Sequence, residues 1–306
     1  MPYYIQLDST GKFKGTWNIT DDQAVRIDVS NAEDGPFNFR ASSGETIWDC
    51  LRRLTCWFEP GSECMFIRMA LNPGQYFPRI ARPVDLDPAG PPKWSPGAWS
   101  ETHVIARSLT QLATLTRQLD RICETVYPSE ETFNTYGHEI RNLLILACTE
   151  AETEWLGVLV ANGITGRRCT TKDYAKLAPS MRLDEYEVEF PRYPWLNPMK
   201  PYSGWSPADN RSQNLAWYQS YNAAKHDREG KFSQATLGCA FQALSAYFII
   251  LVAQYGPGRL GKRLEYSSFF RISRFPSFDP SEAYLRPSSG EPWSPVNYNF
   301  IRADAC

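Results

Sequence analysis

One polar segment near residue 222 holds the side chains best suited to acid–base or phosphate chemistry. Asn222 and His226 are four residues apart, so on a helix they lie on one face, with Tyr218 one turn earlier. His226 is one of only three histidines in the chain, and Lys225 and Arg228 flank it. A histidine in such surroundings can transfer a proton, contact a phosphate or act as a buried hydrogen-bond donor. The sequence does not decide among these three roles of His226.

A second polar group lies on the long helix expected before that segment. Arg141 and Asn142 adjoin an apolar run, so we expect them to face a neighbouring helix and to need partners there. Glu150, on the same helix, would form a purely structural ion pair with Lys225. In the alternative, His226 is a general acid or base, and Arg141 or Lys225 stabilises a phosphate, as metal-free RNA cleavage requires.

The cysteines do not indicate a metal site. The eight cysteines include no Cys-x-x-Cys pair, and the gaps between Cys50, Cys56 and Cys64 are unlike those of a zinc site. We therefore expect no metal, no cofactor and reduced thiols. The N-terminus has no basic start followed by an apolar stretch, so we expect a cytoplasmic protein.

Composition sets the broad class. The chain has 306 residues, 42% of them hydrophobic, which is enough for one large domain or two small ones. The net charge is −2 and the pI about 6.0, so a nucleic acid would have to be bound by a local patch instead of a global basic field.

Three regions follow from the pattern of turns, prolines and apolar positions. Residues 1–95 read as mixed β/α, residues 96–255 as a helical core, and residues 256–306 as an irregular tail rich in proline and aromatic residues. In the first region we expect one helix over residues 45–58. The strands expected there are Tyr3–Leu7, Gly15–Ile19 and Phe37–Arg40.

Four long helices are expected in the central region, separated in the middle by an irregular insertion over residues 163–206. They cover residues 101–126, 129–162, 207–227 and 233–255. Ser129 serves as the expected N-cap of the second helix, and we expect its Glu152 and Glu154 to be solvated. The uncharged segment 232–258 approaches the length of a membrane span, but its polar residues favour a helix buried in the core, so we expect no membrane contact.

The central helices resemble HEPN-like helical bundles over about residues 100–255. The resemblance rests on two stretches followed by an apolar helix: Arg141-Asn142-Leu-Leu-Ile-Leu-Ala-Cys-Thr-Glu150 and Tyr221-Asn222-Ala-Ala-Lys225-His226-Asp-Arg228. It implies a mainly α fold, namely a HEPN-like bundle with a β-containing N-terminal region and the C-terminal tail packed on the bundle. The family's catalytic signature is an arginine and a polar residue, then a histidine after four to six positions. It is incomplete here, because no arginine occupies those places before His226.

HEPN-like proteins are widespread in bacterial toxin–antitoxin and phage-defence systems. Many are metal-independent ribonucleases, and others bind nucleotides or partner proteins. The resemblance therefore implies RNA, a nucleotide or a protein as partner, and a homodimer with its cleft between two copies of the helix at 207–227.

Three functions stay open. The first is a non-catalytic HEPN-like module with Lys225, Arg228, Tyr218, Asn142 and Glu150 as ligand contacts. The second is a ribonuclease with His226, Asn222 and Arg141 as catalytic candidates. In the third, Asn222, Lys225 and His226 only tie helices together.

Overall fold

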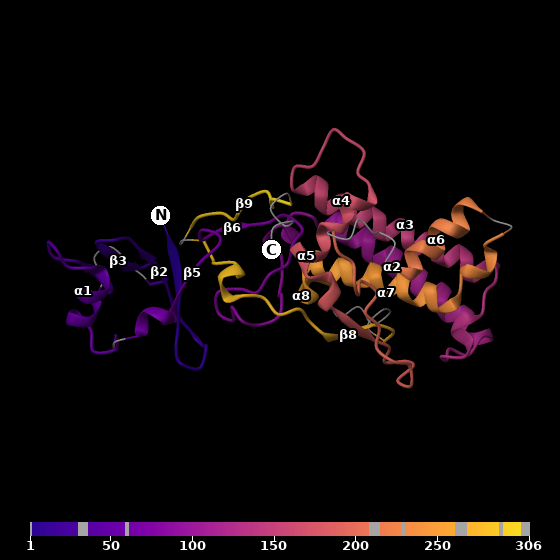
Figure 1. Cartoon of the computed structure of the whole chain (residues 1–306), viewed down its shortest axis with the longest axis horizontal. Helices are drawn as coiled ribbons and strands as arrows, with labels where there is room; N and C mark the ends of the chain where they lie inside the picture. The colour runs from indigo at the N-terminus through magenta and orange to yellow at the C-terminus, as the bar shows by residue number, and fades with distance from the viewer. Residues whose placement is uncertain are drawn as a thin grey trace. The chain divides into compact units, whose positions relative to one another are not determined.

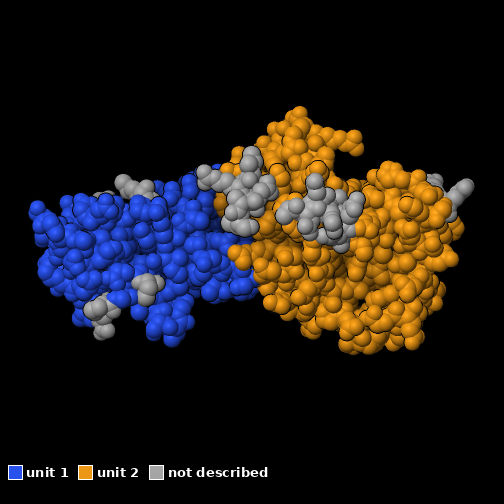
Figure 2. Space-filling view, viewed as in Figure 1, with its two compact units in different colours: residues 1–76, 82–92, 277–296 blue, residues 77–81, 93–276, 297–306 orange. Residues whose placement is uncertain are grey.

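The computed structural model describes residues 2–29, 36–58, 61–207, 215–227, 230–260, 268–287 and 290–300. The chain divides into two compact units (Figure 2). Unit 1 comprises residues 1–76, 82–92 and 277–296, and unit 2 comprises residues 77–81, 93–276 and 297–306. Neither unit is one continuous stretch of sequence.

Unit 1 is built on a five-stranded antiparallel sheet with the order β4-β3-β2-β1-β5. The strands are β1 (Tyr3–Leu7), β2 (Phe13–Ile19), β3 (Gln23–Arg26), β4 (Asn38–Arg40) and β5 (Phe66–Arg68). In the turn between β1 and β2, the Asp8 carboxylate accepts backbone bonds from Thr10 and Lys12, both at 3.0 Å. Gly11 supplies the positive φ of 79° that this turn needs.

The two faces of the sheet are buried by different parts of the chain. Because side chains alternate along a strand, Trp17 and Ile19 of β2 face α1 (Ile47–Leu54), and Ile5 and Leu7 of β1 belong to a separate cluster. That second cluster is completed by Ala283 and Leu285 from the C-terminal region. Unit 1 also contains a parallel pair, β6 (Gln75–Tyr76) with β9 (Ser294–Pro295), and the 3₁₀ turns Ser62–Met65 and Pro280–Glu282.

Unit 2 is mostly helical (Figure 1). Its helices are α2 (Thr102–Thr125), α3 (His138–Ala161), α4 (Thr171–Ala175), α5 (Leu177–Met181), α6 (Ala216–His226), α7 (Leu237–Tyr255) and α8 (Pro257–Leu260). It also has an antiparallel pair, β7 (Glu187–Glu189) with β8 (Arg271–Arg274). The 3₁₀ turns are Pro96–Trp99, Thr132–Asn134, Leu183–Glu185 and Phe232–Gln234.

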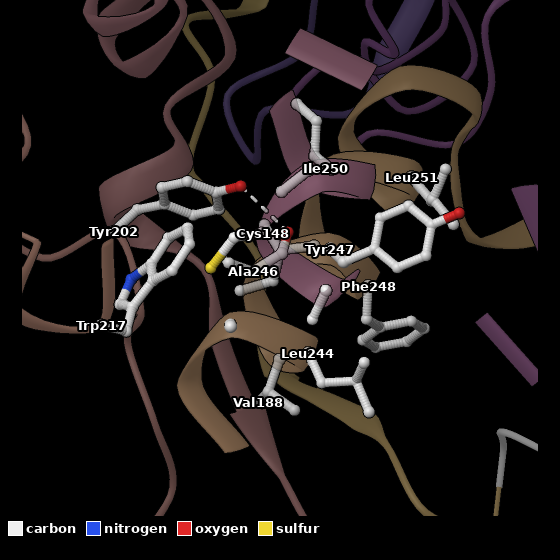
Figure 3. Packing of buried hydrophobic residues seen from close by; sticks show 14 of the residues in the cluster. Cys148, Val188, Tyr202, Trp217, Leu244, Ala246, Tyr247, Phe248, Ile250 and Leu251 are labelled. Carbon is white, nitrogen blue, oxygen red and sulfur yellow. Dashed lines mark hydrogen bonds between the residues drawn. The ribbon is translucent and has the colours of Figure 1, made fainter. Parts of the chain in front are cut away.

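Helix α7 forms the centre of unit 2 and packs against α2, α3 and α6. Its first turn is capped by the Thr236 side chain, which accepts a bond from the Cys239 backbone N–H. Around it, Tyr202 donates a hydrogen bond to the Ala246 carbonyl at 3.0 Å, within the apolar packing that Figure 3 shows. Among the described residues, α7 is the one helix long and apolar enough to span a membrane, and 83% of that window is buried inside the structure.

The expectation of a mainly α fold was wrong, because the protein is mixed α/β. A five-stranded sheet organises unit 1, and two of its strands, β3 and β5, were not expected, because they have only four and three residues. The three strands that were expected are confirmed as β1, β2 and β4, with small changes of boundary in β2 and β4. The expected helix at 45–58 is confirmed in shorter form as α1.

The long helices are confirmed, but the expected N-termini of three were wrong. The helix expected from residue 129 begins at His138, because Ser129 and Thr132 bond each other in a separate 3₁₀ turn. Between that turn and α3 the chain is extended, and the Thr135 carbonyl accepts a bond of 2.8 Å from the Leu237 N–H at the start of α7. The helix expected from residue 233 begins at Leu237, because Phe232–Gln234 form a separate 3₁₀ turn. The helix expected from residue 207 begins at Ala216, after an extended Leu215, and residues 208–214 lie outside the described residues.

Candidate functional site

Helix α6 presents two faces with different roles. Trp217, Tyr218, Tyr221 and Ala224 are buried against the core of unit 2, whereas His226 is exposed. This spacing of apolar residues is the pattern of an amphipathic helix with one side on a core. The predicted site residues of α6 are therefore divided between an inner network and an outer pocket.

The inner network links α6 to α3 through Glu152. Tyr218 donates a hydrogen bond to one carboxylate oxygen of Glu152, and Tyr221 donates to the other at 3.3 Å. Lys225 in turn donates to the Tyr221 hydroxyl at 2.9 Å, and this bond raises the pKa of Lys225. Burial, together with the bond to Glu152, raises the pKa of Tyr218, so that its hydroxyl stays protonated and keeps donating. This network joins two helices, and both oxygens of its carboxylate already accept a bond.

The expectations about three acids of α3 were wrong. Glu150 does not pair with Lys225, because it points towards α2, where it accepts a bond of 3.2 Å from Gln111. Glu154, expected in solvent, is only 5% exposed and accepts bonds from Ser108 at 2.6 Å and Gln254 at 2.9 Å. Glu152, expected to be solvated too, is half-buried in the network described above.

Asn222 and His226 line an open pocket of about 560 Å³ at the C-terminal end of α6. The spacing that predicted one shared face for these two residues is thus confirmed. Neither side chain forms a hydrogen bond or ion pair with another described residue, and His226 is exposed. The other residues that line the pocket are Gln219, Ala223, Asp227, Lys231 and Gln234.

The pocket is rich in groups that both donate and accept hydrogen bonds. Gln219, Asn222 and Gln234 each carry a carboxamide, which offers two N–H donors and one carbonyl acceptor. Lys231 adds a fixed positive charge, and Asp227 a negative one. One Asp227 oxygen already accepts the Gly230 backbone N–H at 2.8 Å, which holds the turn after α6. Such a mixture suits a polar ligand with donors, acceptors and a negative group.

Aromatic rings lie next to this pocket along the chain. Phe232, between Lys231 and the pocket residue Gln234, contacts the ring of Tyr136 at 5.9 Å and that of His138 at 4.9 Å between centroids. Tyr136 is 53% exposed, and His138 is exposed as well. Sequence reasoning missed Lys231 and these rings, although a lysine beside a phenylalanine five residues after His226 was a visible signal.

The remaining predicted site residues do not join the pocket. Arg141 and Asn142 lie in the first turns of α3, where Arg141 Nη1 donates to Asn142 Oδ1 at 3.3 Å. The Nε atom of Arg141 is buried and has no hydrogen-bond partner among the described residues. Arg228 lies outside the described residues.

A second pocket of about 620 Å³ lies between α2 and α3, and sequence reasoning missed it. Glu150, Glu154, Arg107 and Gln111 line it. The apolar periodicity of α2 drew attention to its buried side instead of to these polar positions.

Metal chemistry gains no support from either pocket, since the described part of the chain holds no group of three or more histidine, cysteine, aspartate or glutamate side chains placed to bind a metal ion. No family model matches the chain, and no curated protein or solved structure is significantly similar to it.

Proposed function

We propose that this protein binds a phosphorylated ligand carrying a base, as RNA or as a free nucleotide, in the pocket at the end of α6. The observation that carries the proposal is that His226 and Asn222 are accessible, lie side by side on one face and have no partner within the described protein. Accessible polar side chains without internal partners are available to a ligand.

The chemistry of the pocket favours this class of ligand. Lys231 can pair with a phosphate, and the three carboxamides can bond the edge of a base, as asparagine and glutamine do in nucleic-acid complexes. Tyr136 has an exposed ring that contacts Phe232, the neighbour of Lys231 in the chain, and bases stack on exposed rings. The proposal rests on these contents, and the resemblance to HEPN-like proteins stays a prediction.

Metal-independent RNA cleavage is the second candidate, favoured by the exposure of His226. An unbonded imidazole can accept the proton of a ribose 2′-hydroxyl as that oxygen attacks the adjacent phosphorus. The P–O5′ bond then breaks, and the leaving 5′-oxygen takes a proton from water. The other expected catalytic group, Arg141, is on α3 and bonds Asn142 there, so it adds nothing to the pocket as described. Binding without cleavage is therefore the better-supported function.

The test measures binding and cleavage in one buffer containing EDTA. A fluorescently labelled single-stranded RNA is titrated with protein and followed by anisotropy, and a mononucleotide is then added as competitor. His226→Ala is expected to weaken RNA binding about tenfold or more, the usual effect of losing a hydrogen bond to a charged group. The matched control is His103→Ala, which removes an exposed histidine from α2.

The outcomes separate the two candidates. Binding that His226→Ala weakens and His103→Ala does not, with the RNA intact, supports a binding module. Cleavage by the unaltered protein that His226→Ala abolishes supports the ribonuclease. Competition by the mononucleotide at a similar concentration identifies a nucleotide site instead of an RNA groove. Equal binding by both variants, or none by any of them, removes the basis of the proposal.

A further inference from the structure

The outer face of α3 is unusual for a surface helix. Between residues 142 and 160, the exposed residues of this helix follow each other at intervals of four, three, four, three and four. They are Asn142, Leu146, Thr149, Thr153, Leu156 and Val160. None of them is charged, although solvent-facing positions of helices normally carry charges. Leu146, Leu156 and Val160 remain 43%, 39% and 45% exposed.

We call these six residues the outer stripe. Its two threonines add little polarity to it. The hydroxyl of Thr149 donates to the Ile145 carbonyl and that of Thr153 to the Thr149 carbonyl, both at 2.8 Å. Their donors are therefore already used within the helix, and a γ-methyl remains on each. An uncharged stripe of alternating three- and four-residue spacing is the pattern by which two helices pack along their length.

The four central residues of the outer stripe are arranged symmetrically about Ala151, whereas its two end residues, Asn142 and Val160, differ. Leu146 lies as far before Ala151 as Leu156 lies after it, and the same holds for Thr149 and Thr153. Two antiparallel copies of α3 related by a two-fold axis at Ala151 would therefore place leucine on leucine and threonine on threonine. Self-complementarity of this kind is what a two-fold symmetric dimer requires of its interface.

Helix α2 widens this face. The bonds from Ser108 to Glu154 and from Gln111 to Glu150 show that α2 runs antiparallel beside α3. Its exposed Thr110 donates to the Ala106 carbonyl at 2.8 Å, so this hydroxyl has no free donor, and the exposed Arg107 is the charged side chain that α2 adds here. Ala106, Thr110 and Thr153 line the same groove between the two helices.

We propose that a second copy of this chain covers the α2–α3 face, with the two α3 helices antiparallel. Eighteen residues of helix extend about 27 Å, and two helices about 9 Å apart give a width of about 18 Å. Such a face buries on the order of 1,000 Å² over both copies, slightly below the usual range for stable complexes. The dimer is therefore weak enough to dissociate on dilution. It does not use the pocket at the end of α6.

Sedimentation velocity over a dilution series of the full chain tests this dimer. The unaltered protein is expected to shift from dimer to monomer as it is diluted through the micromolar range. Leu146→Glu is expected to weaken the dimer by about 100-fold or more, because the symmetry buries two unpaired carboxylates in each dimer. Leu86→Glu, at a leucine that is 62% exposed in unit 1, is the control and should leave the dimer intact.

A charge-swap variant tests the antiparallel pairing itself. In the proposed arrangement, position 146 of one copy faces position 156 of the other, so Leu146→Glu combined with Leu156→Lys creates two opposite-charge contacts. We expect each single variant to be monomeric and the double variant to regain at least tenfold in dimer affinity. Circular dichroism on every variant confirms that each stays folded. A monomer at every concentration, or a dimer that Leu146→Glu leaves unchanged, overturns the proposal, and a double variant as weak as the singles overturns the antiparallel pairing.

Discussion

At the residue scale, Glu150 carries a charge that its surroundings disfavour. Burial and the neighbouring carboxylate of Glu154 raise the pKa of Glu150, and the bond from Gln111 and the charge of Arg107 offset this only in part. An acid whose pKa is higher in the folded than in the unfolded state binds protons more tightly when folded. Its contribution to the free energy of unfolding is therefore lost as the pH rises from about 4.3, the usual pKa of glutamate, through the raised value.

Glu150→Gln removes that unfavourable charge and keeps a side chain that can bond Gln111. We expect the variant to have a free energy of unfolding at pH 7 equal to or above that of the unaltered protein, and to lose this advantage at pH 4. Urea unfolding at both pH values measures the difference. Glu131→Gln, which changes an exposed glutamate, should give no pH-dependent change. A Glu150→Gln variant that is less stable at pH 7 would show that the charge is favourable.

The sequence predicts which residues share one face of a helix better than it predicts which residues that face contacts. Four-residue spacing placed Asn222 and His226 on one face, and the structure confirms this. The same reasoning could not choose a partner for Glu150 or foresee the burial of Glu154. The donors to Glu154 come from Ser108 and Gln254, which are 46 and 100 residues away in the chain. Such pairings depend on how helices pack, and local periodicity carries no information about that.

At the scale of elements, the end of α7 depends on one glycine. Gly256 has a φ of 78°, which non-glycine residues rarely adopt, and a Cβ atom on it would overlap the Lys93 backbone carbonyl. Gly256→Ala therefore suffers both backbone strain and a collision with main chain that cannot rotate away. Gly166→Ala is the matched control, since Gly166 has a φ of 76° but no heavy atom within 4 Å of the position that a Cβ would take.

Comparing the two variants measures how much the collision with Lys93, together with the extended ψ of 156° at Gly256, adds to the cost of a positive φ. We expect Gly166→Ala to lower the free energy of unfolding by about 1–2 kcal/mol, the cost of a left-handed conformation. Gly256→Ala should lower it by clearly more, because residues 93 and 94 must also shift. Thermal and urea unfolding of both variants measure this. Equal losses would mean that the backbone near Lys93 yields at little cost.

Helix ends were harder to predict than helices for a related reason. The chain before α3 contains Ser129 followed by two glutamates, a good helix start by local rules. The structure places the start at His138 instead, because Thr135 bonds the backbone of Leu237 at the start of α7. A long-range backbone bond outweighed a local capping signal, and only the assembled unit contains both partners.

At the scale of the whole molecule, the C-terminal region illustrates what a linear reading misses. Residues 277–296 belong to unit 1, together with the N-terminal sheet, although residues 93–276 of unit 2 separate them in the chain. Tyr284 pairs with the backbone near Val84, and β9 lies parallel to β6. Proline-rich segments with few apolar repeats give no sign of the surface they cover. Because the sequence of residues 256–306 does not indicate which surface they cover, this tail was expected to pack on the helical region.

Leu285 tests this arrangement, because it is 1% exposed and joins Ile5 and Leu7 of β1 in one apolar cluster. Leu285→Ala in the full chain removes part of the cover from one face of the sheet and should destabilise unit 1 by about 2–5 kcal/mol. Hydrogen exchange then shows which segments lose stability, since protection of an amide follows the local free energy of opening. We expect faster exchange in Tyr3–Leu7 and unchanged exchange in α7, which belongs to unit 2.

The control is Leu86→Ala, at an exposed leucine of unit 1, which should change the exchange of neither segment. Unaltered protection of β1 in the Leu285 variant would mean that the C-terminal region contributes nothing to the stability of the sheet.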